Sequence, residues 1–189
     1  CGPGNERLAE AVLAQKPDAV LVAGDLLVGR PGADFTPALE LMRRLREAEL
    51  PVYYGNGNHE YRLRLHPEHY GTMYERYTAK LKEYGVTLLE NESVDFETRG
   101  LKMEIFGYEL PEPYYKKFCR AIFRKEDLYR ALGKPDEGRY NILLSHNPVY
   151  FDSYALWGAD LTLSGHLHGG IIRIPGIGGV ITPQVKLFP

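Results

Sequence analysis

Residues 161 to 170, LTLSGHLHGG, place two histidines one residue apart, directly after a short apolar run and before two glycines. An apolar run of this length that ends in small residues is typical of a buried strand. Glycines at the end of such a strand let the backbone turn sharply and let a ligand come close to it. The stretch therefore suggests a ligand site, and it directs attention to other strands that end in the same way.

Three further segments follow the same pattern, running from apolar to small residues and then to Asp, Asn or His: VLVAGD (20–25), VYYGNGNHE (52–60) and ILLSHNP (142–148). In open sheets built from strand–helix units, the carboxyl ends of the strands share one edge, where ligand sites gather. The four endings would bring six polar side chains to one cleft: Asp25, Asn58, His59, His146, His166 and His168. The small residues beside them, which leave room for a ligand, are Gly24, Gly57, Ser145 and Gly165.

These side chains indicate a particular kind of ligand. Neutral imidazoles, a carboxylate and a carboxamide oxygen suit a borderline divalent ion such as Mn, Fe, Zn or Co. His166 and His168 would point in the same direction from an extended strand end, so they could reach one ion or two neighbouring ions. Asp25 is the only carboxylate among these six side chains. It is therefore the candidate to bridge a pair of ions, which in two-metal sites lie about 3.5–4 Å apart.

Each motif alone has a simpler explanation. A single histidine is more often a hydrogen-bonded structural residue than a ligand, and Asp25 after a glycine can simply begin a turn or cap a helix. The four motifs together favour the metal-site interpretation, because four of the six histidines of the chain fall at these strand ends. His66 and His69 lie outside the pattern, at an expected helix start, and we interpret them as surface residues.

The remaining sequence predicts alternating strands and helices, interrupted by a sheet-rich middle. Hydrophobic periodicity predicts helices at 5–16, 34–49, 67–84 and 148–157, strands at 18–25, 52–54, 140–146 and 159–166, and a helical, aromatic stretch at 112–134. Residues 85–110 contain three strand-like runs, with TRG (98–100) as a hairpin turn between the last two. A final hairpin is expected within residues 171–183.

Composition limits the class of protein. With 189 residues, 44% of them hydrophobic, the chain can fill one core, and we treat residues 1–189 as a single domain. No apolar stretch approaches the roughly eighteen residues of a membrane helix. A net charge of −2 argues against nucleic-acid binding by bulk charge. Cys1 and Cys119 are too few for a disulfide framework and have the wrong spacing for a zinc ribbon.

The motifs GD (24–25), GNHE (57–60), SHNP (145–148) and GHLHGG (165–170), in this order and at these distances, resemble the calcineurin-like metallophosphoesterase superfamily. The resemblance runs from about residue 4 to residue 189. GNERL, HNPVYF, WGADLTLSGHLHGG and GGVITP are similar to its bacterial YkuE/YaeI-like branch. The resemblance implies an α+β fold, the four-layer α/β-β/α sandwich of metallo-dependent phosphatases, in which two mixed β-sheets are flanked by helices.

The resemblance also implies a role for each residue. Asp25 matches the bridging carboxylate, and His168 matches a ligand of one ion. The ligands of the other ion are matched by Asn58, His146 and His166. His59 matches the histidine that contacts the substrate phosphate and protonates the leaving group. Family members carry a further D-x-H motif at the end of their first strand; this sequence has none, and we expect it to begin after that strand and to lack the C-terminal strands.

The expected function is that of a binuclear metal-dependent phosphoric ester hydrolase. Such an enzyme hydrolyses a phosphomonoester, phosphodiester or pyrophosphate bond by attack of a metal-bridging water, here on a small-molecule, lipid-linked or nucleotide substrate. Manganese is the first expectation for the two ions, with Fe, Zn, Co and Ni as alternatives. A non-catalytic partner-binding protein on the same fold is the main alternative. A single structural zinc site is a third, but it leaves Asn58 and His59 unexplained.

A basic, aromatic segment bears on the substrate and on localisation. Residues 114–134 contain seven Lys or Arg against two acidic residues, interleaved with aromatic and aliphatic ones. Such a segment can hold a lipid or nucleotide head group or lie on an anionic membrane. The simpler expectation, which we favour, is that its aromatic face packs on the sheets. Relatives in the resembling branch often carry an N-terminal membrane anchor, which only residues upstream of Cys1 could reveal.

Overall fold

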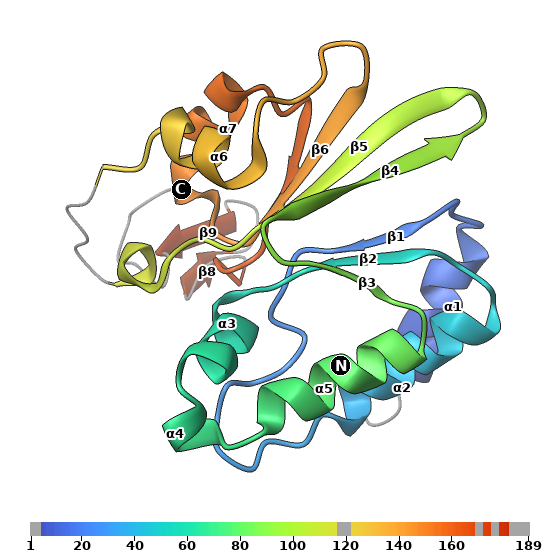
Figure 1. Cartoon of the computed structure of the whole chain (residues 1–189). Helices are drawn as coiled ribbons and strands as arrows, with labels where there is room; N and C mark the ends of the chain where they lie inside the picture. Colours follow the sequence, from blue (N-terminus) through green and yellow to red (C-terminus); the bar gives the residue numbers. More distant parts are fainter. Residues whose placement is uncertain (1–4, 117–121, 169–171, 175–177, 182–189) are drawn as a thin grey trace.

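The protein is described by a computed structural model that covers residues 5–116, 122–168, 172–174 and 178–181. Two β-sheets lie face to face, and helices cover the outer side of each sheet (Figure 1). Cys1, Cys119, the central part of the basic segment and the last residues of the chain lie outside the described residues.

The first sheet is built from the N-terminal half of the chain. Its strands are parallel in the order β1–β2–β3: β1 (Val20–Val22), β2 (Val52–Gly55) and β3 (Thr87–Leu89). The helices packed on its outer face are α1 (Glu6–Ala14), α2 (Thr36–Glu47) and α5 (Met73–Glu83). Alternate residues of β2 face opposite sides, since Tyr54 packs with the helices and Tyr53 packs toward the second sheet.

The second sheet follows from the middle of the chain onward. Its order is β4–β5–β6–β7: β4 (Glu92–Thr98), β5 (Leu101–Tyr108), β6 (Tyr140–Ser145) and β7 (Leu161–Leu163). Only the β4–β5 pair is antiparallel. Arg99 and Gly100, both with positive φ, form the predicted hairpin turn between these two strands. Helices α6 (Lys125–Leu132) and α7 (Phe151–Trp157) cover its outer face.

An apolar layer joins the two sheets. It consists of buried residues from both inner faces: Tyr53, Leu89, Met103, Ile105, Ile142 and Leu144. The backbones come closest near the carboxyl ends of the strands, where a Cβ on Gly107 would lie 2.4 Å from the Leu89 carbonyl oxygen. The expected four-layer sandwich is therefore confirmed. The first sheet is parallel rather than mixed within the described residues.

Several helix predictions were wrong in detail. Residues 58–65 form helix α3 (Asn58–Leu65), which was not predicted. The predicted helix at 67–84 is divided into α4 (Pro67–Tyr70) and α5, because Gly71 between them has a φ of 57°.

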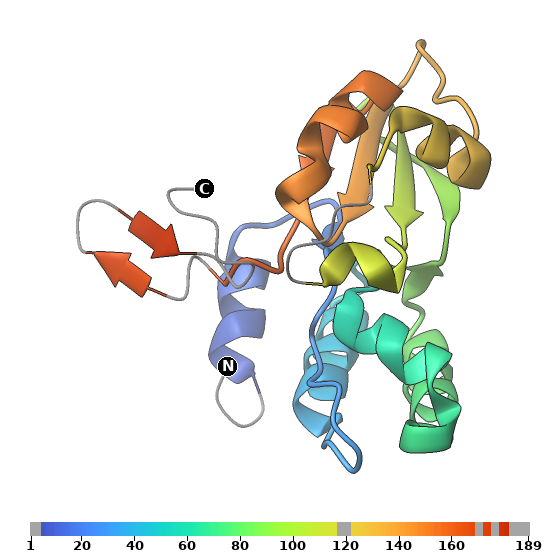
Figure 2. The ribbon, with the colours of Figure 1, turned by 90° about the vertical axis from the view of Figure 1, so that its left-hand side faces the viewer.

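The stretch at 112–134 is helical only in part. It contains a short 3-10 helix at Glu112–Tyr115 and helix α6. A further 3-10 turn, Pro148–Tyr150, precedes α7. The final hairpin is confirmed as β8 (Ile172–Ile174) paired with β9 (Gly178–Ile181), and it projects to one side of the two sheets (Figure 2).

Candidate metal centre

Asp25 lies in a tight turn three residues after the end of β1. Gly24 and Asp25 both have positive φ values, 82° and 56°, so the chain reverses sharply here. A Cβ on Gly24 would lie 2.3 Å from the backbone nitrogen of Gly57, so only glycine lets the loops after β1 and β2 approach this closely. The Asp25 carboxylate accepts a hydrogen bond from the His59 backbone N–H over 2.9 Å. The two loops are thereby joined at the candidate site.

The side chain of Glu60 stabilises this turn through buried hydrogen bonds. Glu60 was not predicted as a site residue. Its carboxylate is fully buried and accepts the backbone N–H groups of Asp25, Leu26 and Gly57, each over 3.0 Å. Tyr54 Oη donates a fourth hydrogen bond over 2.7 Å. Glutamate at the third position of a helix often accepts from the N-cap backbone. That signal, GNHE followed by a helix, could have identified Glu60.

The second sheet contributes two imidazoles. His146 is 2% exposed, and its Nδ1 donates to the Ala23 carbonyl oxygen over 2.5 Å, so the neutral ring carries its lone pair on Nε2. This Nε2 lies 2.9 Å from Asp25 Oδ2. His166 Nδ1 donates to Asn58 Oδ1 over 2.9 Å, so the neutral His166 ring also carries its lone pair on Nε2. Both Nε2 atoms are buried; among the described residues that of His146 has only the Asp25 carboxylate beside it, and that of His166 has no hydrogen-bond partner.

This arrangement tests whether the residues suit a cation. One ligand atom each from Asp25, His146 and His166 lie within 4.8 Å of one another. Buried polar groups normally find partners, and a cation held by the two imidazoles and the Asp25 carboxylate would supply one. The donor set of imidazole and carboxylate suits a borderline divalent ion. The residues therefore fit the metal site that the sequence predicted.

His59 is oriented differently from the two other imidazoles. Its Nδ1 accepts the backbone N–H of Gly29 over 3.0 Å, so the neutral ring carries its proton on Nε2. That Nε2 lies 3.9 Å from Asp25 Oδ2. Asn58 and His59 are the first two residues of α3, which sets both next to Asp25. His59 is thus a hydrogen-bond donor at the site rather than a lone-pair acceptor.

His168 is not one of the three residues whose ligand atoms lie within 4.8 Å of one another. Strand β7 ends at Leu163, and His166 and His168 have φ values of 64° and 53°, so they are not in an extended strand. The expected extended conformation of these two residues was therefore wrong; Gly165, just before them, donates its N–H to the His146 carbonyl oxygen. His168 is exposed and lines the same cavity of about 380 Å³ as Asp25, His146 and His166.

Burial and neighbouring charges shift the pKa values of these side chains in different directions. Burial and the neighbouring His146 lower the pKa of His166 to about 4, so this ring is neutral at pH 7. Burial also lowers the pKa of His59. Burial alone would raise the pKa of Asp25, but contact with His146 outweighs it and the net shift is downward. The same contact raises the pKa of His146 against the opposing effect of its burial.

Tyr115 is a second residue that was not singled out for the site. Its ring centroid lies 5.2 Å from that of His166 and 6.4 Å from that of His146. His66 and His69 lie on or next to α4, where His66 contacts Glu68 and Glu112 rather than the cluster. The expected surface position fits His69, whose side chain is 70% exposed, better than His66, at 34%.

Sequence comparisons place this chain in a known family. Residues 3–170 match the model of the calcineurin-like phosphoesterases. The chain is 31% identical over 176 residues to the uncharacterized protein YpbG of Bacillus subtilis (strain 168), covering 92% of this chain and 60% of YpbG. It is 25% identical over 175 residues to phosphodiesterase YaeI of Escherichia coli (strain K12), covering 90% and 56%.

YkuE of Bacillus subtilis (strain 168), an uncharacterized metallophosphoesterase, is 27% identical over 175 residues, which covers 89% of this chain and 53% of YkuE. The chain belongs to the calcineurin-like phosphoesterase family, and the predicted resemblance is confirmed. It spans between about half and three fifths of the length of these three relatives. Membership of this family implies a hydrolase of phosphoesters that uses divalent metal ions.

Proposed function

We propose that this chain forms a single domain carrying the catalytic centre of a binuclear metal-dependent phosphoesterase. The observation that carries the proposal is the convergence of one ligand atom each from Asp25, His146 and His166 within 4.8 Å, with the buried His166 Nε2 lacking a hydrogen-bond partner among the described residues. Asp25, Asn58, His146 and His166 would hold the cations, with His168 as an outer ligand from the same cavity. Divalent cations, when bound, neutralise charge on phosphoryl oxygens and generate a nucleophile from water at neutral pH.

The residues of the chain divide the remaining work. His59 presents Nε2–H toward the space beside Asp25, where it can donate to a phosphoryl oxygen or to the departing oxygen of the ester. The backbone N–H of Gly29 holds the ring in this tautomer. Asn58 links His166 to the start of α3, so the donor and the ligands keep a fixed distance. His59 is the proposed substrate-binding and catalytic residue, assisted by Asn58.

Asp25→Asn tests this function in the complete protein. The substitution keeps the shape of the side chain but removes the charge that the cations require. We expect cation-dependent hydrolysis of bis(p-nitrophenyl) phosphate to fall by roughly 10²-fold or more. Cation content, measured by elemental analysis, should fall with it. Activity near that of the wild type would reject the assignment of Asp25.

Cation stoichiometry separates the proposal from its alternatives. Two ions per complete chain, together with hydrolysis, support the binuclear enzyme, and elemental analysis also decides between manganese, which we propose first, and Fe, Zn, Co or Ni. One tightly held zinc without hydrolysis supports a structural site. Cation binding with no hydrolysis of phosphomonoesters, phosphodiesters or pyrophosphates supports a partner-binding protein on the same fold.

Contact with a membrane through residues 114–134 is the least supported part of the proposal. Phe123 and Leu128, from the apolar side of this segment, are buried against the second sheet, as the simpler alternative expects. Among the residues that the structure describes, no helix is both long enough and apolar enough to cross a bilayer. The side chains of Arg130 and Lys134 are more than 70% exposed. Equal, negligible binding to neutral and anionic vesicles would reject a lipid role for this surface.

A further inference from the structure

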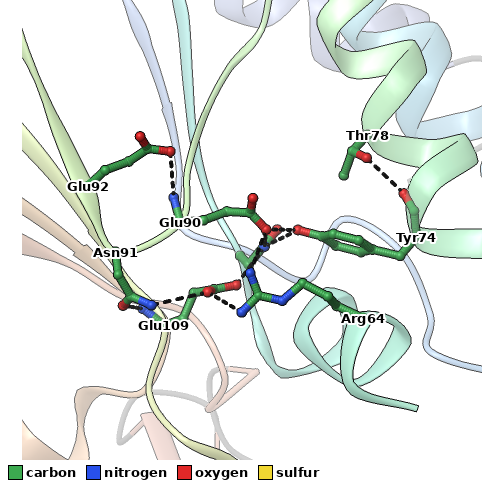
Figure 3. Close-up of polar contacts among 8 residues, drawn as sticks. Arg64, Tyr74, Thr78, Glu90, Asn91, Glu92 and Glu109 are labelled. Carbon is green, nitrogen blue, oxygen red and sulfur yellow. Dashed lines mark hydrogen bonds and ion pairs between the residues drawn. The ribbon is translucent and has the colours of Figure 1, made fainter. Parts of the chain in front are cut away.

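A buried polar network lies beside the candidate centre, and none of the roles assigned so far involves it. Figure 3 shows Arg64 between the carboxylates of Glu90 and Glu109, with Asn91 and Tyr74 on either side. The side chain of Glu109 is 1% exposed, whereas that of Arg64 is 33% exposed. Buried charges persist in proteins only where several partners satisfy them. We therefore asked what these groups hold in place.

Glu109 binds two points on the segment that carries Asn58 and His59. Its Oε1 accepts from the Asn56 side-chain amide over 2.9 Å, and its Oε2 accepts from the Arg64 guanidinium over 2.6 Å. Asn56 stands two residues before Asn58, the first residue of α3, and Arg64 lies in the last turn of that helix. One carboxylate is thus hydrogen-bonded both to Asn56, just before the helix, and to Arg64 in its last turn.

The carboxylate belongs to the opposite half of the molecule. Glu109 follows the end of β5 in the second sheet, whereas Asn56 and α3 follow β2 in the first sheet. Asn91 fixes Glu109 itself, since its side-chain oxygen accepts the Glu109 N–H over 2.9 Å. The segment that continues from Glu109 leads to Tyr115, whose ring contacts His166. Glu109 therefore connects the segment that leads to Tyr115 with the segment that carries Asn58 and His59.

Further contacts restrain the side chains of Asn56 and Arg64. The Asn56 amide also donates to Tyr74 Oη over 2.7 Å, and the Arg64 guanidinium donates to Glu90 over 2.8 Å and lies over the Tyr61 ring at 5.1 Å. Arginine is suited to this position because its planar fork can donate to two carboxylates at once.

We propose that Glu109 and Arg64 are positioning residues, which set α3, and with it Asn58 and His59, at the correct distance from the imidazoles of the second sheet. The expected effect on kcat rests on the proposed function, whereas the expected effect on the position of α3 does not. Misplacing a catalytic group by about 1 Å from a remote site can lower the rate roughly 10²-fold. Among the described residues, no contact joins this network to Asp25 or to the imidazoles of the cluster.

The test compares Glu109→Ala and Arg64→Ala with Arg139→Ala in the complete protein. Arg139 is a matched control, because its side chain is 32% exposed and also pairs with two carboxylates, Asp95 and Asp136, but on the β4 side of the second sheet. Glu109→Gln is the conservative variant, since it retains one acceptor oxygen, for Asn56 or Arg64, while the charge and the second acceptor are lost.

We expect two measured quantities, the amide exchange rate and kcat, to change together in Glu109→Ala and Arg64→Ala. Hydrogen exchange of the Gly57 and His59 amides should become faster by on the order of tenfold in Glu109→Ala and Arg64→Ala, because both amides donate within the loop that the network holds. The kcat for bis(p-nitrophenyl) phosphate should fall by roughly 10²-fold with KM changed much less. Glu109→Gln should lose less than Glu109→Ala, and Arg139→Ala should stay within about twofold in both measurements.

Each outcome decides a separate claim. If wild-type exchange rates persist in Glu109→Ala and Arg64→Ala, the inference is wrong. It is also wrong if kcat falls equally in Arg139→Ala, because the effect would then be general loss of stability. If the wild type hydrolyses no phosphoester, the proposed function fails while the exchange measurement still tests the positioning role. Where Glu109→Ala does not fold, Glu109→Gln carries the same comparison.

Discussion

The two halves of the molecule supply the candidate centre in different ways. The first half presents Asp25 from a turn beyond the end of β1, and the side chain of Glu60 satisfies the backbone amides of that turn. The second half presents His146 directly after β6, where the sheet fixes its backbone, and a carbonyl of the first half, that of Ala23, orients its ring. A ligand in a turn needs a buried scaffold, whereas a ligand next to a strand end takes its position from the sheet.

The strongest test of this comparison removes the scaffold of the first half. Glu60→Ala leaves three backbone amides and the Tyr54 hydroxyl without their acceptor. We expect it to lower the free energy of unfolding by about 3–5 kcal/mol and to abolish cation binding. Denaturant unfolding and cation titration measure the two effects.

Ser164→Ala is the counterpart in the second half. It removes a single hydrogen bond, which Ser164 Oγ donates to the Ser145 carbonyl oxygen over 2.6 Å. The expected loss is about 0.5–1.5 kcal/mol, with cation binding retained. If Ser164→Ala were as damaging as Glu60→Ala, the two halves would depend on their side chains equally and the comparison would be wrong.

The two glycines next to the ligands sharpen the same contrast. Gly24 has a positive φ and faces backbone, whereas a Cβ on Gly165 would meet the edge of the His146 ring at 2.9 Å. Gly24→Ala should therefore destabilise the fold by at least about 2–3 kcal/mol, because backbone strain at the positive φ adds to the clash of the new Cβ with the Gly57 backbone. Gly165→Ala should cost less stability but weaken cation binding by displacing His146. Thermal unfolding with and without added Mn²⁺ separates the two; the opposite ranking in stability would contradict the role of the Gly24 turn.

The smallest effect is expected at the surface link between the halves. Arg99, in the β4–β5 turn, reaches Asp18 before β1 over 3.2 Å, but its side chain is 77% exposed. Arg99→Ala should change the free energy of unfolding by less than about 1 kcal/mol and leave cation binding unchanged. A larger loss in chemical denaturation would show that the halves are joined at their exposed rim as well as through the apolar layer.

The sequence predicted the parts of the site that lie next to strands. Asp25, His146 and His166 follow apolar runs long enough to identify a strand, and the shared edge of such strands brought them together. His168 could not be oriented in this way, because strand alternation ends where β7 ends and the local φ is positive. The four-layer arrangement followed from the family resemblance rather than from periodicity.

Helix α3 shows why the remainder was missed. From Glu60 to Leu65 the sequence EYRLRL alternates polar with apolar residues, which favours a strand over a helix. It is helical because Glu60 and Arg64 find buried partners far away in the chain, and these contacts override the local pattern. A buried glutamate and a paired arginine both look like surface residues until the partner segment is known.

The close approach of Gly107 to Leu89 has a consequence for how the protein responds to its surroundings. The candidate ligands come from both sheets, so any breathing motion that parts the sheets also divides the ligand set. A cation that binds only the closed arrangement would make such openings rarer in proportion to its concentration. Metal supply would then govern how long the molecule survives proteases, in addition to any effect on turnover.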